Sequence, residues 1–376
     1  MPEFGVGLIG CGNISTAYLS LAPMFAGFDM RAVADLHPDA AARQAQAFGL
    51  RALSVEDLLA APNIDVVVNL TVPAAHFDVT RQILEAGKHA YSEKPLVLNL
   101  AEGEVLRDLA ASKGLRIGAA PDTFLGGVHQ HARALIDAGA VGQVTSGTAH
   151  VMSRGMEAWH PNPDFFFAPG AGPILDLGPY YITNLVQLLG PVRSVLAQAV
   201  TAFERRTIGS GPRAGETVPV RTPTTLHGLL TFEVGAVISL GASWDVAAHR
   251  HGHMELYGTN GTLFLPDPNY FGGTLELGTE TSIETLAPLD HPFGLPNAHS
   301  TDGRANYRMA GLADLVAAIR ADRPHRCGLD LALHVVEVMT ALLEAAERGE
   351  RVDVASTCTR PAPLSPQDAQ DLLRAV

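Results

Sequence analysis

Phe4-Gly5-Val6-Gly7-Leu8-Ile9 opens directly into Gly10-Cys11-Gly12-Asn13-Ile14-Ser15, and a second apolar run, Met30 to Ala34, ends on Asp35. This order predicts a strand, a glycine turn, a helix and a second strand followed by an acidic residue. Gly10 permits a tight turn, and Gly12 lets the backbone approach a pyrophosphate. A helix that begins at Asn13 and Ile14 would point its unpaired N–H groups at the phosphate charge. The stretch therefore predicts a dinucleotide-binding βαβ unit.

The residues around Asp35 indicate which dinucleotide is bound. Its carboxylate would accept hydrogen bonds from the ribose hydroxyls and would repel a ribose 2′-phosphate. The next residues are Leu36, His37 and Pro38, so no Arg or Lys follows closely to offset that repulsion. We expect NAD rather than NADP. The alternative is a plain βαβ unit without a nucleotide, because Ser15 stands where a third glycine or alanine is usual.

Composition limits the class of protein. The chain has 376 residues, of which 47% are hydrophobic and 17% charged, which suits two domains with substantial cores. Its net charge is −13, from 39 acidic and 26 basic residues. A general attraction to nucleic acid or anionic lipid is therefore not expected, and a small neutral substrate fits better.

Cysteine usage and apolar runs indicate the compartment. Cys11, Cys327 and Cys358 are far apart and odd in number, which argues against a disulfide framework and a cysteine-built metal site. The first residues lack a basic segment followed by a long apolar stretch, so we expect no signal peptide. The longest apolar region, 329–346, is interrupted by charged residues and predicts an amphipathic helix rather than a membrane span. We expect a cytoplasmic protein.

The first third of the chain alternates short strands and helices. Helices are expected over 38–48, 55–60, 75–86 and 101–113, and strands over 64–70, 89–92 and 116–120. This rhythm predicts a doubly wound parallel sheet with helices on both faces, forming a domain over residues 1–122.

From about Asp122 the pattern changes to longer strands. After a helix over 128–138, strands are expected over 143–152, 192–204, 224–233, 236–245, 254–258 and 262–265, with a hairpin turn at Asn260-Gly261. Long strands with few helices between them predict a second α+β domain over 123–376, built on a large, mostly antiparallel open sheet. The Gly/Pro/Arg-rich stretch over 205–223 is expected to be an exposed loop.

Glu93-Lys94-Pro95 follows the short strand over 89–92. Ligands of open α/β sheets bind outside the carboxyl ends of the strands, so Lys94 can face a nicotinamide. A surface lysine paired with its neighbour is the alternative.

Several motifs, in order along nearly the whole chain, together resemble the glucose-fructose oxidoreductase, inositol dehydrogenase and MocA (Gfo/Idh/MocA) family. They are Gly10-Cys11-Gly12-Asn13-Ile14, Asp35, Thr71-Val72-Pro73 with His76, Glu93-Lys94-Pro95, Ala120-Pro121-Asp122, 176–181 and 257–261. The resemblance implies an NAD(P)-dependent enzyme that oxidises or reduces a secondary alcohol of a sugar or polyol. It also implies that Lys94 contacts cofactor and substrate and takes part in proton transfer, and that Thr71, Pro73, His76, Glu93 and Asp122 help to hold the cofactor.

The family's second motif, commonly DxGxHxxD, reads Asp176, Gly178, Tyr180 and Thr183 here. If Tyr180 replaces the usual His, it becomes the natural proton donor or acceptor, and Lys94 and the oxidised nicotinamide would help it to ionise. A packing tyrosine is the alternative. Asp176 would hydrogen-bond substrate hydroxyls and hold a cation nearby, or it would cap a helix.

Two further groups are candidates for substrate binding. The segment Trp159-His160-Pro161, followed by three phenylalanines at 165–167, offers an aromatic platform for the C–H faces of a sugar. A hydrophobic plug or a subunit contact is the alternative. His249, His251 and His253 alternate as if on one strand face, with Glu255 on the same parity. Substrate binding by His249, or a charged surface strand, is more plausible than a metal site, because nothing else supplies a full ligand shell. No metal is expected.

These residues predict an NAD-dependent oxidoreductase in which Lys94, Tyr180 and Asp176 are catalytic and Trp159, His160, Asp176, Tyr180 and His249 bind the substrate. Two alternatives stay open. One is a non-redox sugar lyase or glycosidase with tightly bound NAD, and the other is a non-catalytic sugar or dinucleotide sensor. Family resemblance also implies a homodimer or homotetramer that pairs through the exposed face of the second domain's sheet.

Overall fold

The first sheet has the doubly wound topology that the alternating pattern predicts. The computed structural model describes residues 3–300 and 303–375. Six parallel strands lie in the order β3-β2-β1-β4-β5-β6. They are β1 (Phe4–Ile9), β2 (Phe28–Ala34), β3 (Arg51–Leu53), β4 (Val66–Asn69), β5 (His89–Ser92) and β6 (Ile117–Ala119). The order reverses between β1 and β4, so the carboxyl ends of these two strands flank the expected ligand crevice.

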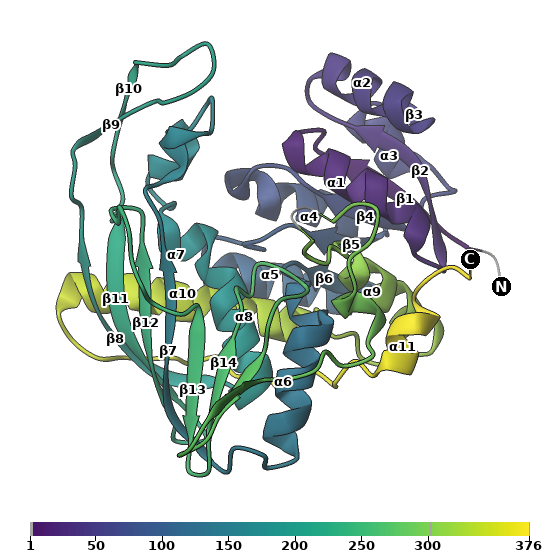
Figure 1. Cartoon of the computed structure of the whole chain (residues 1–376). Helices are drawn as coiled ribbons and strands as arrows, with labels where there is room; N and C mark the ends of the chain where they lie inside the picture. The colour runs from purple at the N-terminus through teal and green to yellow at the C-terminus, as the bar shows by residue number, and fades with distance from the viewer. Residues whose placement is uncertain (1–2, 301–302, 376) are drawn as a thin grey trace.

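Five helices connect these strands (Figure 1). They are α1 (Asn13–Leu21), α2 (Pro38–Phe48), α3 (Val55–Ala60), α4 (His76–Glu85) and α5 (Leu100–Lys113). The predicted bounds of α2 and α3 are confirmed. Pro38 begins α2 at a position that tolerates proline, and the Ser54 side chain caps α3 by accepting a hydrogen bond from the amide of Asp57.

The second sheet has nine strands in the order β16-β15-β14-β13-β7-β12-β11-β8-β17, and among these described strands only β7 and β12 pair in parallel. Their bounds are β7 (Val144–Met152), β8 (Val192–Val200), β11 (Thr225–Phe232), β12 (Val237–Ser243), β13 (Met254–Gly258), β14 (Thr262–Leu265), β15 (Glu276–Gly278), β16 (Ile283–Thr285) and β17 (Val352–Asp353). The hairpin at Asn260-Gly261 is confirmed between β13 and β14. The predicted α/β architecture with a mostly antiparallel second sheet is therefore confirmed.

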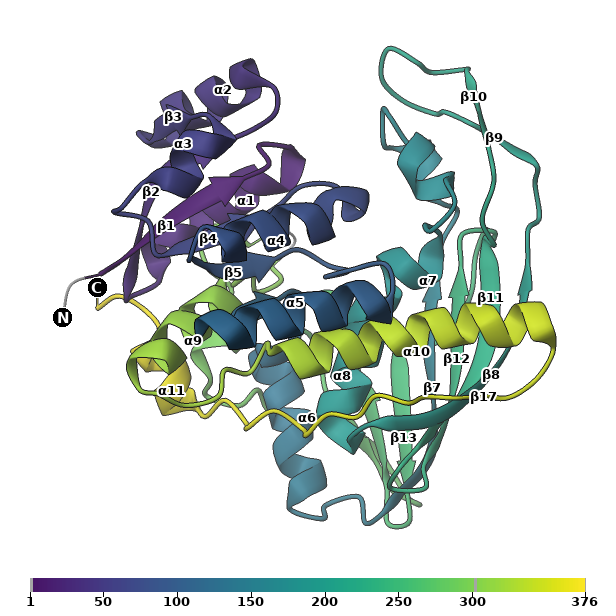
Figure 2. The ribbon, with the colours of Figure 1, turned by 180° about the vertical axis from the view of Figure 1, so that it is seen from behind.

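Helices cover one face of this sheet. They include α6 (Gly127–Asp137), α7 (Pro173–Asp176), α8 (Gly178–Leu189) and α10 (Leu329–Arg348), and Figure 2 shows α10 running across the sheet. The opposite face carries side chains such as Leu196, Leu229 and Val237, which are exposed. No described helix is both long enough and apolar enough to cross a membrane.

The last part of the chain returns to the first sheet. Helix α9 (Ala310–Arg320) packs near β6, and Gly118 forms a bridge with Gly328. After α11 (Pro366–Asp371), Leu373 bridges to Phe25. The C-terminal segment therefore contacts the first sheet as well as the second. The domain boundary at residue 122 stays a prediction.

The stretch over 205–223 is mostly exposed as expected, but the prediction that it is a loop is wrong. This stretch contains the hairpin of β9 (Arg205–Thr207) and β10 (Thr217–Pro219). Ile208 and Val218 are buried in a small second core with Phe167 and Trp244. Gly and Pro marked the turns correctly, but the two short strands are stabilised by side chains from distant segments, which local composition does not report.

Candidate active site

The turn between β1 and α1 requires its first glycine. Gly10 has φ +103°, and a Cβ there would lie 2.6 Å from the carbonyl carbon of Leu70. Only glycine adopts this conformation without strain and fits so close to the neighbouring backbone. The turn therefore brings β1 and the end of β4 together at the switch point of the sheet.

Gly12 has a different surrounding. It is the N-cap of α1 and makes no side-chain cap hydrogen bond, and a Cβ at Gly12 would meet no heavy atom within 4 Å. Asn13 and Ile14 are exposed in the first turn. The helix thus presents unpaired N–H groups to open space, which fits a pyrophosphate. Ser15 is buried and bonds the Gly12 carbonyl, so it packs the turn instead of facing a ligand.

Asp35 lies beside this turn. Its Oδ2 accepts a hydrogen bond from the amide of Cys11 at 2.7 Å, and Oδ1 accepts one from the amide of His37 at 2.8 Å. The carboxylate is therefore held in a fixed orientation and keeps lone pairs for further donors. Its expected bond to ribose stays a prediction, for which this orientation is suitable.

His76 links two turns at the carboxyl ends of β4 and β5. It is buried, with Nδ1 2.6 Å from the Pro95 carbonyl and Nε2 2.9 Å from the Thr71 carbonyl. Thr71 donates to Asn69, and Pro73 begins the short turn that leads into α4. His76 thus supports the two backbone segments, and cofactor contacts of His76, Thr71 and Pro73 stay predictions.

Glu93 connects Lys94 to the dinucleotide-binding helix. Glu93 Oε1 accepts a hydrogen bond from Tyr18 Oη at 2.8 Å, and Oε2 accepts one from the Lys94 amide at 2.9 Å. Tyr18 is buried on α1. Both carboxylate oxygens are engaged, so Glu93 fixes the backbone from which Lys94 extends.

Lys94 reaches the second domain. Its Nζ donates to the Asp176 carbonyl at 2.7 Å and to Asp176 Oδ1 at 2.8 Å. Burial lowers the pKa of Lys94, but Asp176, Tyr180 and Glu93 outweigh it and raise the pKa above its usual 10.5. Lys94 is therefore a charged ammonium at neutral pH, which can donate hydrogen bonds and stabilise negative charge but is not a free base.

Tyr180 lies next to this ammonium. The Lys94 Nζ is 5.2 Å from the centre of the Tyr180 ring. Burial raises the pKa of the phenol above 10.0, while Lys94 and Arg308 act in the opposite direction. The expected cationic influence of Lys94 on Tyr180 is present, but the effect of burial on the pKa is larger.

Asp176 does not cap α8. It ends α7, and the N-cap of α8 is Leu177, which has no side-chain cap hydrogen bond. Asp176 and Tyr180 therefore lie on two consecutive helices, and both lie against Lys94. Thr183 is buried in α8.

Arg308 is a site residue that the sequence did not reveal. It lies two residues before α9, bonds Asn269 Oδ1 at 3.1 Å, and has Tyr180, Asp122 and Glu93 as electrostatic neighbours. These groups raise its pKa against the effect of burial. No local pattern marked it, because only the return of the chain brings it to the first sheet.

The Asp122 carboxylate binds backbone amides at the start of α9. Its Oδ2 accepts from the amides of Met309 and Gly311 at 2.9 and 3.1 Å. Burial raises its pKa to about 6, against the effect of these amides and of Arg308. Asp122 thus anchors the start of α9, and a cofactor contact stays a prediction.

A cavity of about 240 Å³ adjoins Lys94 and Asp176. The turn after β4 and the segment before α7 form its walls, and Phe165 and Phe166 line it, whereas Trp159 and His160 do not. Trp159 is 62% exposed, and His160 packs edge-on against Phe165 and Phe166. The aromatic segment therefore does border the site, but through its phenylalanines.

The histidines at 249–253 do not lie on a strand, because β13 begins only at Met254. His249 stacks on His251, whose ring centre lies 4.1 Å from that of His150 on β7. His253 Nδ1 instead lies 3.0 Å from Tyr181 Oη. The expectation of a shared strand face is wrong, and His249 lines none of the cavity at Lys94. Within the described ranges, no three His, Cys, Asp or Glu side chains are grouped so that they could hold a metal ion.

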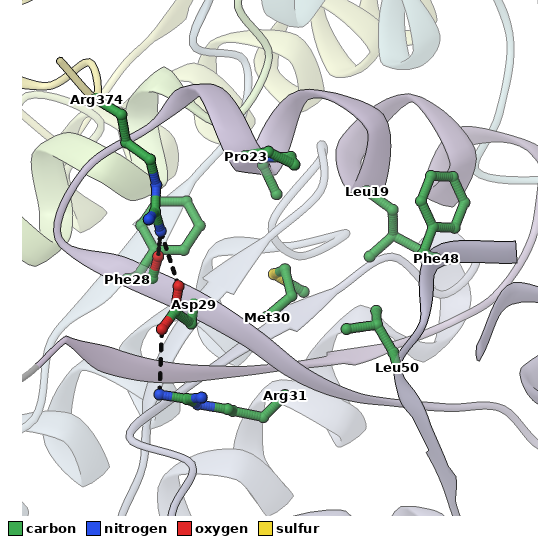
Figure 3. Close-up of a pocket in the computed structure, with 10 residues that line it drawn as sticks. Leu19, Pro23, Phe28, Asp29, Met30, Arg31, Phe48, Leu50 and Arg374 are labelled. Carbon is green, nitrogen blue, oxygen red and sulfur yellow. Dashed lines mark hydrogen bonds and ion pairs between the residues drawn. The ribbon is translucent and has the colours of Figure 1, made fainter. Parts of the chain in front are cut away.

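Another cavity, of about 370 Å³, lies beside α1 and β2 and shares no lining residue with the cavity at Lys94 (Figure 3). On its rim, Asp29 pairs with Arg374 at 2.8 Å and with Arg31 at 3.2 Å. The pair between Asp29 and Arg374 attaches the C-terminal end to the first sheet.

Comparison with known proteins agrees with this fold. A family model described as an oxidoreductase family with an NAD-binding Rossmann fold matches residues 4–120, and one described as the GFO/IDH/MocA C-terminal domain matches residues 129–264. Levoglucosan dehydrogenase from Pseudarthrobacter phenanthrenivorans is 27% identical over 294 residues, which is 70% of this chain and 73% of that enzyme. An uncharacterized oxidoreductase of Schizosaccharomyces pombe is 33% identical over 149 residues, and the match spans only 39% of its length.

Solved structures share the fold over nearly the whole chain. An NAD binding oxidoreductase from Klebsiella pneumoniae superposes with a TM-score of 0.81 at 23% identity, covering 94% of this chain and 100% of that one. Levoglucosan dehydrogenase in complex with NADH and L-sorbose has a TM-score of 0.80 at 22% identity, with 95% and 100% coverage.

Proposed function

Since the chain belongs to the Gfo/Idh/MocA family of NAD(P)-dependent oxidoreductases, we propose that it transfers a hydride between NAD and a secondary alcohol or ketone of a sugar, sugar derivative or polyol. The contact between Lys94 and Tyr180 carries the proposal, because it joins an ammonium from the first sheet to a phenol from the second domain. The similarity to levoglucosan dehydrogenase supports a sugar as the substrate class.

Different residues of the chain would bind the cofactor, transfer the proton and stabilise charge. Gly12 and the first turn of α1 would hold the pyrophosphate and Asp35 the ribose, and the bound nicotinamide would supply the hydride acceptor. In alcohol oxidation the ionised phenolate of Tyr180 would accept the proton of the substrate hydroxyl, and in ketone reduction the neutral phenol would donate it back. Lys94, which stays charged, would stabilise the negative charge on the oxygen and the phenolate, and Asp176 would orient the Lys94 ammonium.

A panel of sugars and polyols tests the proposal. The absorbance of reduced cofactor is followed with NAD and NADP in parallel. Net formation of NADH with at least one sugar or polyol is expected. Conversion of a sugar without net NADH would instead identify a non-redox enzyme with retained NAD, and binding without any conversion would identify a sensor.

We also propose that the chain forms a homo-oligomer through the exposed face of the second sheet. Leu196 and Leu229 are directly paired between β8 and β11 and lie exposed on this face with Val237, and apolar side chains that are exposed together favour association. Sedimentation would give the oligomeric state, and Leu229→Lys is expected to yield monomers.

A further inference from the structure

The cavity at Lys94 is built from both domains. Val72, Pro73 and Ala74 line it from the turn after β4, and Phe165 and Phe166 line it from the segment before α7. Its volume of about 240 Å³ is below the roughly 300–1,000 Å³ of cavities that enclose whole drug-sized ligands. The cavity therefore suits one part of a ligand whose remainder lies in the open crevice.

The lining is almost wholly apolar. Among the described residues that line the cavity, only Lys94 and Asp176 have polar side chains, and these bond each other. The remaining lining consists of Val, Leu, Pro, Ala, Gly and Phe. A sugar carries hydroxyl groups around its ring, and burying each one without a partner costs free energy. The far end of this cavity is thus unsuited to a plain sugar.

Two of the lining side chains are unusually exposed for their size. Val72 is 59% exposed and Phe165 46% exposed, and they come from different domains. An apolar group in the cavity would remove surface of both from water, which is favourable in proportion to the area buried. Such half-exposed apolar walls are typical of a binding surface.

We propose that the substrate carries an apolar substituent, such as the aromatic ring of an aryl glycoside, which occupies this cavity while the reacting hydroxyl faces Lys94. This inference rests on the proposed function for the identity of the reaction, but the preference for an apolar substituent can be measured without turnover. The rival occupant is the nicotinamide ring of the cofactor, which also has apolar faces.

Titration calorimetry with matched glycosides separates these occupants. Methyl and phenyl glycosides of each panel sugar are titrated into the protein, with and without saturating NADH. With NADH bound, the Kd of the phenyl compound should be lower by at least about tenfold, because burial of one aromatic ring changes affinity by this order. If NADH abolishes the preference, the cavity belongs to the nicotinamide and the proposal is overturned. Equal or undetectable binding in every pair also overturns it.

Variants from both domains test the location. Val72→Thr adds a hydroxyl at nearly constant volume, and Phe165→Ala removes the aromatic wall. Each should reduce the phenyl-to-methyl affinity ratio at least about threefold, since each removes part of the apolar contact. Phe203→Ala is the matched control, because Phe203 is 54% exposed but lies outside the cavity lining. An unchanged ratio in both cavity variants would contradict the proposal.

The two hypotheses fail in different ways. Tighter binding of phenyl glycosides without any redox reaction would support the site for an apolar substituent and contradict the oxidoreductase function. Oxidation of sugars or polyols without phenyl preference would do the reverse.

Discussion

Lys94 and Asp176 are joined by two hydrogen bonds from one ammonium group, at 2.7 Å to the backbone carbonyl and 2.8 Å to the carboxylate. Lys94 follows β5 of the first sheet, and Asp176 ends α7 of the second domain. The contact therefore joins the two domains at the carboxyl edge of the parallel sheet and holds the ammonium next to Tyr180.

Lys94→Ala is expected to lower kcat by at least about 100-fold, because it removes a preorganised positive charge from the reacting oxygen. The affinity for NADH, measured by fluorescence titration, should change little. Lys113→Ala is the control, since Lys113 bonds only the Glu85 carbonyl on α4 among the contacts described. Undiminished turnover in Lys94→Ala would remove Lys94 from the mechanism.

The two glycines of the first turn should respond differently to the same substitution. Gly10→Ala forces a positive φ and a 2.6 Å contact with Leu70, so it should destabilise the protein by at least about 2 kcal/mol. Gly12→Ala meets no protein atom within 4 Å and should cost less than about 1 kcal/mol. Its added methyl would occupy space at the helix N-terminus, so NADH affinity should fall at least about tenfold. Thermal unfolding and NADH titration measure the two effects, and equal NADH affinity in Gly12→Ala and wild type would argue against a pyrophosphate there.

Asp35→Ala is expected to relax the preference for NAD over NADP. The substitution removes the charge that would repel a 2′-phosphate, and it also removes the acceptor of the Cys11 amide. We expect the ratio of kcat/KM for NAD to that for NADP to fall at least about tenfold, on the basis of one lost charge interaction. Should the wild-type protein use both cofactors equally, the role assigned to Asp35 would be refuted.

Sequence patterns predicted the parts of the site that depend on local order. The turn at Gly10 and Gly12, and Lys94 at the end of a buried strand, follow from hydrophobic periodicity and glycine spacing over a few residues. The resemblance to a family added Tyr180, which no periodicity would have selected.

The remaining parts depend on contacts between distant segments. Arg308 comes to the site because α9 returns to β6, and the β9–β10 hairpin forms because Trp244 and Phe167 pack against Ile208 and Val218. His249 and His251 alternate like strand residues, yet they lie in the loop before β13, where His251 stacks on His249 and on His150 of β7. Tertiary packing overrides local preference in each case.

Tyr18 is expected to position Lys94 through Glu93. Tyr18→Phe removes only the hydroxyl that bonds Glu93 Oε1, and we expect kcat to fall roughly tenfold, which corresponds to about 1.4 kcal/mol. NADH affinity should stay within about twofold of wild type, because the helix itself is unchanged. Tyr91→Phe is the matched control, since the buried Tyr91 hydroxyl finds no nitrogen or oxygen partner. Equal kcat values for Tyr18→Phe and Tyr91→Phe would contradict the positioning role of Tyr18.

Stability should fall between pH 6.5 and pH 4 because burial lowers the pKa of several histidines, among which His150 and His129 show the largest shifts. Burial, followed by His251 and His227, lowers the pKa of His150 from 6.5 to about 4, and burial lowers that of His129 to about 4. The unfolded chain then binds more protons than the folded protein in this range, so the stabilisation is complete above pH 6.5 and is lost as the pH falls towards 4. The urea midpoint of the wild-type protein should decline from pH 7 to pH 4.5. The decline should be less steep in His150→Gln, because this variant lacks the contribution of His150 and keeps that of His129. His37→Gln, at an exposed helix start, should keep the wild-type slope. An identical decline in His150→Gln and wild type would show that protonation of His150 does not cause the loss of stability at low pH.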